Sequence, residues 1–175
     1  MTGDFPNEPK AVLIVAPHTS NYDGRVVVSA LLALGMRVSF FVKHTAFRWP
    51  VAGLMRWFGA LPVNRESSQD LVGFSASKFS EKNELLLAMA PEGTRDSSPA
   101  FKSGFYWIAR QAGVPVIVIG FDYGRREVRI LKTLAPSGDP ERDLPDILAC
   151  YRGITPRHPE RLSLPLRELD RTAPD

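Results

Sequence analysis

A histidine and an aspartate, five positions apart, follow the first apolar run of the chain. That run, 11–16 (AVLIVA), is typical of a buried strand, and the polar segment 17–23 (PHTSNYD) comes directly after it. A carboxylate that accepts a hydrogen bond from one imidazole nitrogen leaves the other nitrogen free to take a proton from a hydroxyl group. His18 and Asp23 therefore indicate a general base and the acid that orients it. The spacing alone is a weak signal, because Asp23 could instead complement the N-terminus of a helix and His18 could be an ordinary loop residue.

A second reactive loop follows the apolar run 85–90 (LLLAMA). Its residues, 91–96 (PEGTRD), combine a glycine that permits a tight turn, the hydroxyl of Thr94 and the planar guanidinium of Arg95, which matches phosphate oxygens. Glu92 could hold a substrate hydroxyl or orient the arginine. The loop thus indicates an anion site, and a surface turn with a Glu92–Arg95 ion pair is an equally good interpretation.

Two more loops carry basic residues. Lys43 and His44 follow the apolar run 38–42, and Arg65 follows the run 60–63. A single arginine at the end of a strand is usually a solvated charge, and a single histidine is more often a loop residue than a ligand. Neither loop indicates a function by itself.

Alternating strands and helices are needed to position these four loops. The predicted strands are 11–16, 38–42, 60–63, 85–90 and 115–121, with 128–131 as an antiparallel strand at the sheet edge. The predicted helices are 26–34, 51–58, 68–79, 103–112 and a C-terminal helix that has Leu144, Ile147, Leu148 and Tyr151 on one face. This order predicts a single α/β domain with a mostly parallel central sheet and helices on both faces. Ligands of such sheets bind outside the carboxyl ends of the strands, where all four loops begin.

The composition is that of one globular domain. The 175 residues are 44% hydrophobic and 23% charged, which excludes a disordered, collagen-like or low-complexity chain. We expect a motif-bearing core at about 11–132, followed by the C-terminal helix and an irregular, proline-rich tail at about 139–175.

Cysteine content and hydropathy predict the compartment. The single cysteine, Cys150, can form neither an internal disulfide nor a multi-cysteine metal site, which favours a reducing environment. The start of the chain is too polar for a signal peptide, and no apolar run reaches the roughly 18 to 20 residues that span a bilayer. We therefore expect a cytoplasmic protein, with peripheral contact at the cytoplasmic face of a membrane as the one form of membrane contact.

The formal net charge of +3 conceals an uneven distribution. No acidic residue lies between Asp23 and Glu66, whereas this stretch contains six basic residues, namely Arg25, Arg37, Lys43, Arg48, Arg56 and Arg65. Aromatic residues interleave with them, namely Phe40, Phe41, Phe47, Trp49, Trp57 and Phe58. This basic stretch suits contact with an anionic lipid surface, although its aromatics could equally form an ordinary core below a solvated rim of charges.

Taken together, the loops resemble the motif blocks of the glycerophosphate acyltransferase family. In chain order the blocks are His18-x4-Asp23, 59–65 (GALPVNR), 91–95 (PEGTR) with 101–104 (FKSG), and 114–116 (VPV). Four ordered blocks are far more specific than any one of them. The chain is most similar to the lysophosphatidate (1-acylglycerol-3-phosphate) O-acyltransferase branch, as a short form without N-terminal membrane helices. It departs from the usual family pattern at Pro17, Ala90, Asp96 and Val118, and none of these departures removes a residue that the chemistry needs.

The resemblance implies direct acyl transfer. His18 would act as general base on a hydroxyl of the acceptor, with Asp23 orienting it, and that hydroxyl would attack the thioester of acyl-CoA or acyl carrier protein. The acceptor would be a glycerol-phosphate or a lysophospholipid. Its binding site would be lined by Arg65, Glu92, Gly93, Thr94 and Arg95, and charge and loop position add Lys43 and Lys102 as phosphate candidates. No metal or other cofactor is implied.

Two other functions are compatible with the residues. A metal-dependent phosphoester hydrolase could use His18, Asp23 and His44, although the sequence lacks a convincing fourth ligand. A non-catalytic module could bind anionic lipid or nucleic acid through the basic stretch. No recognised nucleic-acid motif accompanies that stretch, so a nucleic-acid partner is not expected.

Overall fold

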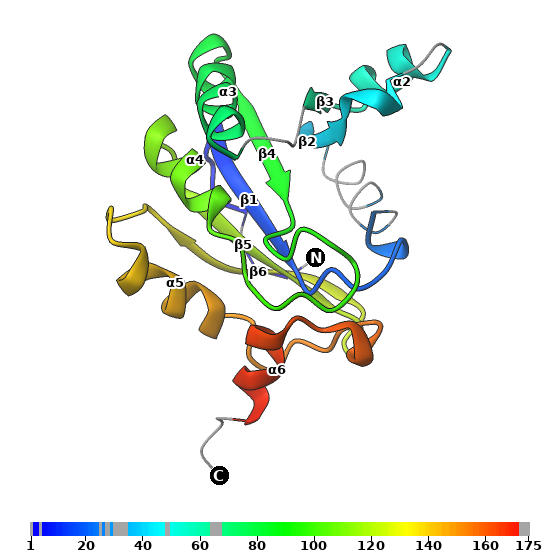
Figure 1. Ribbon diagram of the computed structural model, residues 1–175, viewed down its shortest axis with the longest axis vertical. Coiled ribbons are helices and arrows are strands. Elements are labelled where there is room, and N and C mark those ends of the chain that lie inside the picture. Colours follow the sequence, from blue (N-terminus) through cyan, green and yellow to red (C-terminus); the bar gives the residue numbers. More distant parts are fainter. Residues whose placement is uncertain are drawn as a thin grey trace.

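A mostly parallel sheet organises the chain. The computed structural model describes residues 2–3, 5–24, 26, 29, 35–47, 50–63 and 68–171. Across these residues, six strands form one sheet in the order β3-β2-β4-β1-β5-β6 (Figure 1). The strands are β1 (Lys10–Ala16), β2 (Val38–Lys43), β3 (Ala60–Val63), β4 (Leu85–Met89), β5 (Val116–Asp122) and β6 (Glu127–Leu134). Neighbouring strands from β3 to β5 pair in parallel, and β6 pairs antiparallel with β5 at the edge.

Helices connect the strands and close the chain. In the described residues they are η1 (His44–Ala46), α2 (Val51–Trp57), α3 (Ser68–Glu81), α4 (Gly104–Ala112), α5 (Pro140–Ala149), η2 (Pro159–Arg161) and α6 (Leu164–Arg171). Residues 22–24 are also helical, and the helix predicted at 26–34 falls mostly outside the described residues. Capping explains two of the boundaries. The α4 helix ends at Gly113, which has a left-handed φ of 65°, and α5 begins after Asp139, whose carboxylate accepts two backbone N–H groups of the first turn.

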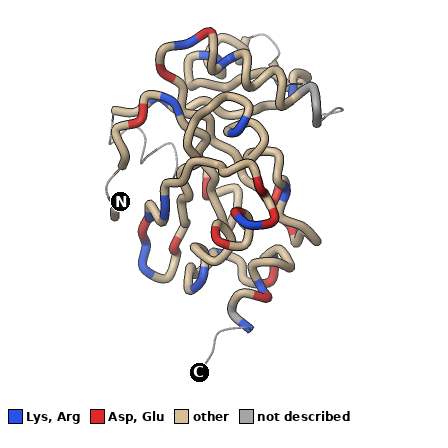
Figure 2. Tube along the Cα trace, turned by 90° about the vertical axis from the view of Figure 1, so that its left-hand side faces the viewer, with Lys and Arg blue, Asp and Glu red and all other residues tan. Residues whose placement is uncertain are grey.

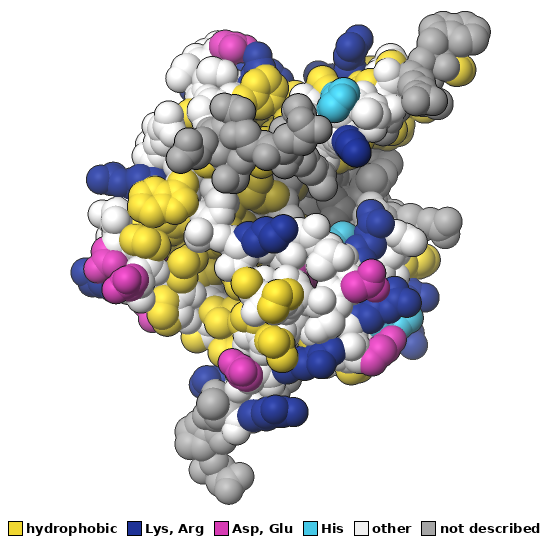
Figure 3. Space-filling model, viewed as in Figure 1, with side chains coloured by type: hydrophobic (Ala, Val, Ile, Leu, Met, Phe, Trp, Pro, Cys, Tyr) yellow, Lys and Arg dark blue, Asp and Glu magenta, His cyan; other side chains and the backbone are white. Residues whose placement is uncertain are grey.

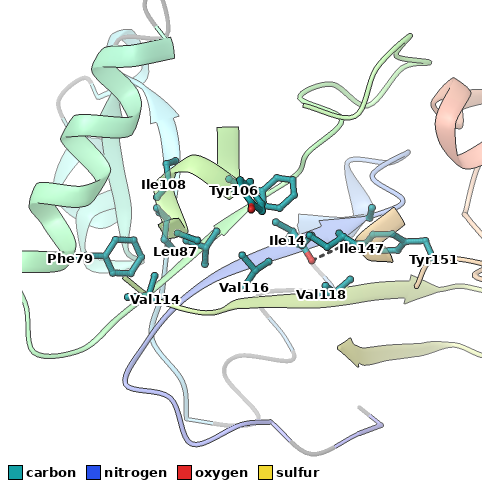
Figure 4. Packing of buried hydrophobic residues seen from close by; sticks show 14 of the residues in the cluster. Ile14, Phe79, Leu87, Tyr106, Ile108, Val114, Val116, Val118, Ile147 and Tyr151 are labelled. Carbon is teal, nitrogen blue, oxygen red and sulfur yellow. Dashed lines mark hydrogen bonds between the residues drawn. The ribbon is translucent and has the colours of Figure 1, made fainter. Parts of the chain in front are cut away.

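The larger part of the core lies on one face of the sheet. There β1 and β5 pack against α3, α4 and α5, and Figure 4 shows Ile14, Val116, Val118, Phe79, Ile108 and Ile147 of this cluster. Val12 and Phe105 belong to the same cluster. On the opposite face, Leu13, Ile117 and Ile119 form a smaller cluster against Phe5. Successive residues of a strand point to opposite faces, and here both faces are buried. This is why both strands appear in the sequence as unbroken apolar runs.

The predicted fold class is confirmed. The structure is a single α/β domain with a mostly parallel sheet, one antiparallel pair and helices around it. The tail after α5 differs from the expectation, because it contains α6 as well as irregular segments. Its proline content suggested irregular structure, but Pro165 lies in the first turn of α6, where the missing N–H costs no helical hydrogen bond.

Membrane-spanning structure was not expected from the hydropathy. In the described ranges, no helix combines the length and the apolar character that a bilayer crossing requires.

Candidate active site

The carboxyl ends of the parallel strands carry the candidate site. Because β1 lies between β4 and β5, the loop after β1 has the β4 loop on one side and the β5–β6 turn on the other. The long β4 loop and the C-terminal segment with α6 lie on the side of the sheet to which the β4 arrow points (Figure 1). The fold thus places the predicted base between two loops that follow neighbouring strands.

His18 and Asp23 form a side-chain pair. His18 Nδ1 lies 3.0 Å from Asp23 Oδ2, with the His18 side chain 21% exposed and the Asp23 side chain fully buried. The two side chains are at ion-pair distance without the geometry of a regular hydrogen bond. With Nδ1 facing the carboxylate, Nε2 is the nitrogen left to accept a proton.

The Asp23 carboxylate has three donors around it. Besides His18, Oδ2 accepts the backbone N–H of Ser20 at 2.9 Å, and Oδ1 accepts the hydroxyl of Tyr123 at 2.5 Å. Burial pushes the pKa of Asp23 upward, but the close contact with His18 and the hydrogen bonds from Tyr123 and Ser20 outweigh it and hold the pKa below its ordinary value. Asp23 is therefore ready to carry a negative charge beside the imidazole.

The same aspartate also starts a helix. Ser20 Oγ accepts the N–H of Tyr22 at 3.0 Å, while Asp23 reaches back to the N–H of Ser20, as in a capping box. The two interpretations of Asp23, helix start and orienting acid, are thus compatible. The cap fixes the carboxylate at one position, and the imidazole meets it there.

Tyr123 and Arg157 belong to the site, although no motif in the sequence singled them out. Tyr123 follows β5 directly, and the Arg157 guanidinium lies 4.4 Å from the ring centroid of Tyr22 and 5.7 Å from that of Tyr123. The three side chains also line a pocket of about 430 Å³ beside the dyad. Tyr123 could have been predicted from the rule that ligands bind at the carboxyl ends of the strands, because it follows β5 directly. Arg157 could not, because it reaches the site only through tertiary folding.

The C-terminal segment is attached to the loops of the site. The N–H of His158 donates to Thr19 Oγ1 at 3.2 Å, and the N–H of Tyr123 donates to the carbonyl of Thr155 at 2.9 Å. These bonds join the segment to the β1 loop and to the end of β5. They explain how Arg157 comes to lie over two tyrosines.

Glu92 is buried under the loop that follows β1. Glu92 is 2% exposed, and its Oε2 accepts the backbone N–H of His18 at 2.5 Å. Burial raises the pKa of Glu92, although donation from His18 and interactions with Ser163 oppose the rise. The alternative in which Glu92 pairs with Arg95 in a surface turn is wrong, since the carboxylate is in the interior. Its role as a substrate ligand stays a prediction.

Residues 93–97 and Lys102 of the β4 loop are exposed. Gly93 has a φ of 69°, and a Cβ at this position would lie 2.7 Å from Lys102 Nζ. The glycine therefore allows the Lys102 side chain to lie directly on the turn. Thr94 Oγ1 accepts the N–H of Asp96, and Arg95 is exposed. The structure brings Gly93, Thr94, Arg95 and Lys102 together, with their proposed substrate contacts still a prediction.

The two remaining predicted ligands lie farther along the sheet. Lys43 ends β2 and is exposed, at the same sheet edge but with β4 between its strand and β1. Arg65 lies outside the described residues. His44 begins η1, and in the described ranges no three His, Cys, Asp or Glu side chains gather as a metal-ligand group. His18, Asp23 and His44 therefore do not form the ligand set that the hydrolase hypothesis required.

Comparison with known proteins gives one match. A model of the Acyltransferase family matches residues 3–122, which include the sheet from β1 to β5, the dyad and the β4 loop. No curated protein and no solved structure matches the chain. The match spans more than half of the sequence and contains every motif block from which the resemblance was argued. The chain therefore belongs to the glycerophosphate acyltransferase family.

Proposed function

We propose that this acyltransferase moves a fatty acyl group from a thioester to a hydroxyl of a glycerol-phosphate or lysophospholipid, as in the 1-acylglycerol-3-phosphate O-acyltransferase branch. The observation that carries the proposal is the His18–Asp23 contact of 3.0 Å at the carboxyl end of β1. A buried, charged aspartate beside a partly exposed histidine is the arrangement of a general base.

The chemistry needs no acyl-enzyme. His18 Nε2 takes the proton of the acceptor hydroxyl while the oxygen attacks the thioester carbonyl. The tetrahedral intermediate then collapses, the C–S bond breaks, and the imidazolium returns the proton to the leaving thiolate. Asp23 holds the imidazole and stabilises its positive charge during the transfer.

Both substrates are proposed to be anionic. The exposed cations on the β4 loop, Arg95 and Lys102, and Lys43 at the carboxyl end of β2 are suited to the acceptor phosphate. Arg65, which belongs to the second motif block of the sequence, is proposed as a further phosphate ligand. The donor is proposed to be acyl-CoA or acyl carrier protein, which supplies the thioester without any cofactor. A thiol-release assay that combines both donors with glycerol-3-phosphate, lysophosphatidate and other lysophospholipids tests this. Absence of transfer for every pair overturns the proposed function.

Arg95→Ala is expected to raise the KM for the acceptor by about tenfold to a hundredfold with a much smaller change in kcat. The guanidinium is exposed on the β4 loop, so its removal deletes a phosphate contact without disturbing the core. Initial-rate kinetics over acceptor concentration measure the effect. Arg152→Ala, also exposed but on the turn after α5, is the matched control. An unchanged KM in Arg95→Ala would remove this residue from the acceptor site.

Contact with an anionic membrane surface is proposed through α2. Leu54, Trp57 and Phe58 are 58%, 73% and 42% exposed. Arg56 lies among them in a stretch that contains no acidic residue. Hydrophobic side chains lie beside Lys and Arg over α2 in Figure 3, whereas charges of both signs are spread along the rest of the trace in Figure 2. An apolar face flanked by cations is complementary to anionic lipid.

Trp57→Ser is expected to weaken binding to vesicles of mixed phosphatidylcholine and phosphatidylglycerol by about tenfold, because the variant loses the most exposed of the three apolar side chains that would enter the lipid. Vesicle co-sedimentation measures the partition coefficient. Trp107→Ser is the matched control, since Trp107 is 43% exposed on α4, outside the basic stretch. Equal loss of binding in the two variants, or none in Trp57→Ser, contradicts the assignment of α2.

A further inference from the structure

The hydroxyl of Tyr123 forms a short contact with the candidate catalytic aspartate. Its oxygen lies 2.5 Å from Asp23 Oδ1, while His18 Nδ1 approaches the other carboxylate oxygen, Oδ2, at 3.0 Å. The tyrosine hydroxyl and the imidazole thus reach opposite oxygens of one fully buried carboxylate. A donor that holds the free oxygen of such a carboxylate restricts its rotation and stabilises its charge.

Tyr123 is in turn held by its own neighbours. Its backbone is fixed by the N–H bond to Thr155 at the end of β5. The Arg157 guanidinium lies over its ring and over that of Tyr22. Burial and the bond to Asp23 raise the pKa of Tyr123, and contact with Arg157 opposes part of that rise. The hydroxyl therefore keeps its proton at neutral pH and acts as a donor to Asp23.

We infer that Tyr123 is a positioning residue of the dyad, which fixes and polarises Asp23 through its hydroxyl and which Arg157 holds in place. The chain of contacts then runs from Arg157 through Tyr123 and Asp23 to His18. This inference rests on the proposed function, in which His18 is the general base. It adds two residues from the β5 end and the C-terminal segment to a dyad that lies wholly in the loop after β1.

The inference predicts an effect on turnover rather than on substrate affinity. Without the hydroxyl, Asp23 Oδ1 loses its donor and the carboxylate holds a proton more tightly. Tyr123→Phe should therefore lower kcat by about tenfold to a hundredfold, the value of one hydrogen bond to a charged group. The KM values should stay within about twofold, because the aromatic ring that lines the pocket is retained.

The pH dependence of kcat/KM distinguishes a positioning role of Tyr123 from a purely structural role. The acid limb of the kcat/KM profile, which is its fall at low pH, reports protonation of the coupled His18–Asp23 pair. Its midpoint should move to higher pH by about one unit in Tyr123→Phe. Within the described residues, the other charged groups shown next to the pair are Glu92, which accepts the His18 backbone N–H, and Arg157, which lies over the Tyr123 ring. Both are unchanged in the variant, so the movement reports the lost hydroxyl. Arg157→Met should shift the limb in the same direction but less far, because it removes only the cation next to the hydroxyl.

Tyr106→Phe is the matched control. The Tyr106 hydroxyl donates to Asp143 Oδ2 at 2.9 Å between α4 and α5, so the variant also deletes a tyrosine–aspartate hydrogen bond. It should lower the melting temperature while leaving kcat and the acid limb at their wild-type values. Equal kcat and equal acid limbs in wild type and Tyr123→Phe would overturn the inference, as would the same loss of activity in both tyrosine variants.

Two further measurements test the role of Tyr123 even if Tyr123→Phe folds poorly or if the protein shows no acyl transfer. Incorporation of 3-fluorotyrosine at position 123 keeps the side-chain shape but makes the hydroxyl a stronger donor, so the acid limb should move to lower pH. Titration of the Asp23 carboxyl carbon by NMR needs no substrate, and its midpoint should be higher in Tyr123→Phe than in wild type. An unchanged midpoint rejects the role of Tyr123, whereas a raised midpoint in a protein without acyl transfer rejects only the proposed function.

Discussion

His18→Ala is expected to lower kcat for acyl transfer by about 10²- to 10⁴-fold, the usual contribution of a positioned general base. The fold should survive, because the structural contact of this residue is its backbone N–H, which donates to Glu92 and which alanine retains. The imidazole itself is partly exposed and fills no cavity of the core. Residual turnover should come from substrate positioning alone.

Thiol release from the best donor and acceptor pair measures the effect, with near-ultraviolet circular dichroism as the test of folding. His44→Ala is the control, because His44 is exposed in η1 at the end of another strand. Normal turnover in a folded His18→Ala protein would reject the proposed mechanism. Loss of turnover in both histidine variants would show that the assay reports general damage.

Part of the fold could be predicted from the sequence because β1 and β5 are buried on both faces. The continuous apolar runs that became β1 and β5 can be recognised without knowledge of any partner. The β6 strand was predicted as 128–131 but spans Glu127–Leu134. Most of its residues are half-buried at the sheet edge, so the apolar pattern shows only its centre. The α6 helix was not predicted for a related reason, since its proline, Pro165, favoured a loop and its burial depends on tertiary contact.

The residues of the candidate site differ in the same way, because some could be predicted from local sequence and others depend on tertiary contacts. His18 and Asp23 were accessible because they lie in one loop, at a spacing that a single strand end and helix start can position. Arg157 was not, because it meets Tyr22 and Tyr123 only after the C-terminal segment has folded back on the sheet. The burial of Glu92 was equally hidden, since a Pro-Glu-Gly turn in a sequence gives no sign that its carboxylate points inward to the His18 backbone.

Asp23→Asn should cost about as much activity as the loss of the base, about 10³- to 10⁴-fold in kcat. The carboxylate accepts from Ser20 and Tyr123 and faces the imidazole, whereas an asparagine presents one oxygen and one NH₂ group. At least one of the three donors then meets another donor. If the imidazole reverses its tautomer to accept from the NH₂ group, Nε2 carries the proton and cannot act as base.

The same substitution predicts a pH-dependent loss of stability. The pKa of Asp23 in the folded protein lies below its ordinary value of 3.8, so ionisation stabilises the fold above that value, and this stabilisation is lost as the pH falls through the folded pKa. The difference in melting temperature between wild type and Asp23→Asn should therefore be largest near neutral pH and shrink below about pH 3.8. Asp146→Asn is the control, since that side chain is 75% exposed and its contact with Lys132 spans 3.8 Å. A difference that stays constant from pH 7 to pH 3 would mean that the charge of Asp23 does not stabilise the folded state. Any loss of activity would then come from the orientation of His18 alone.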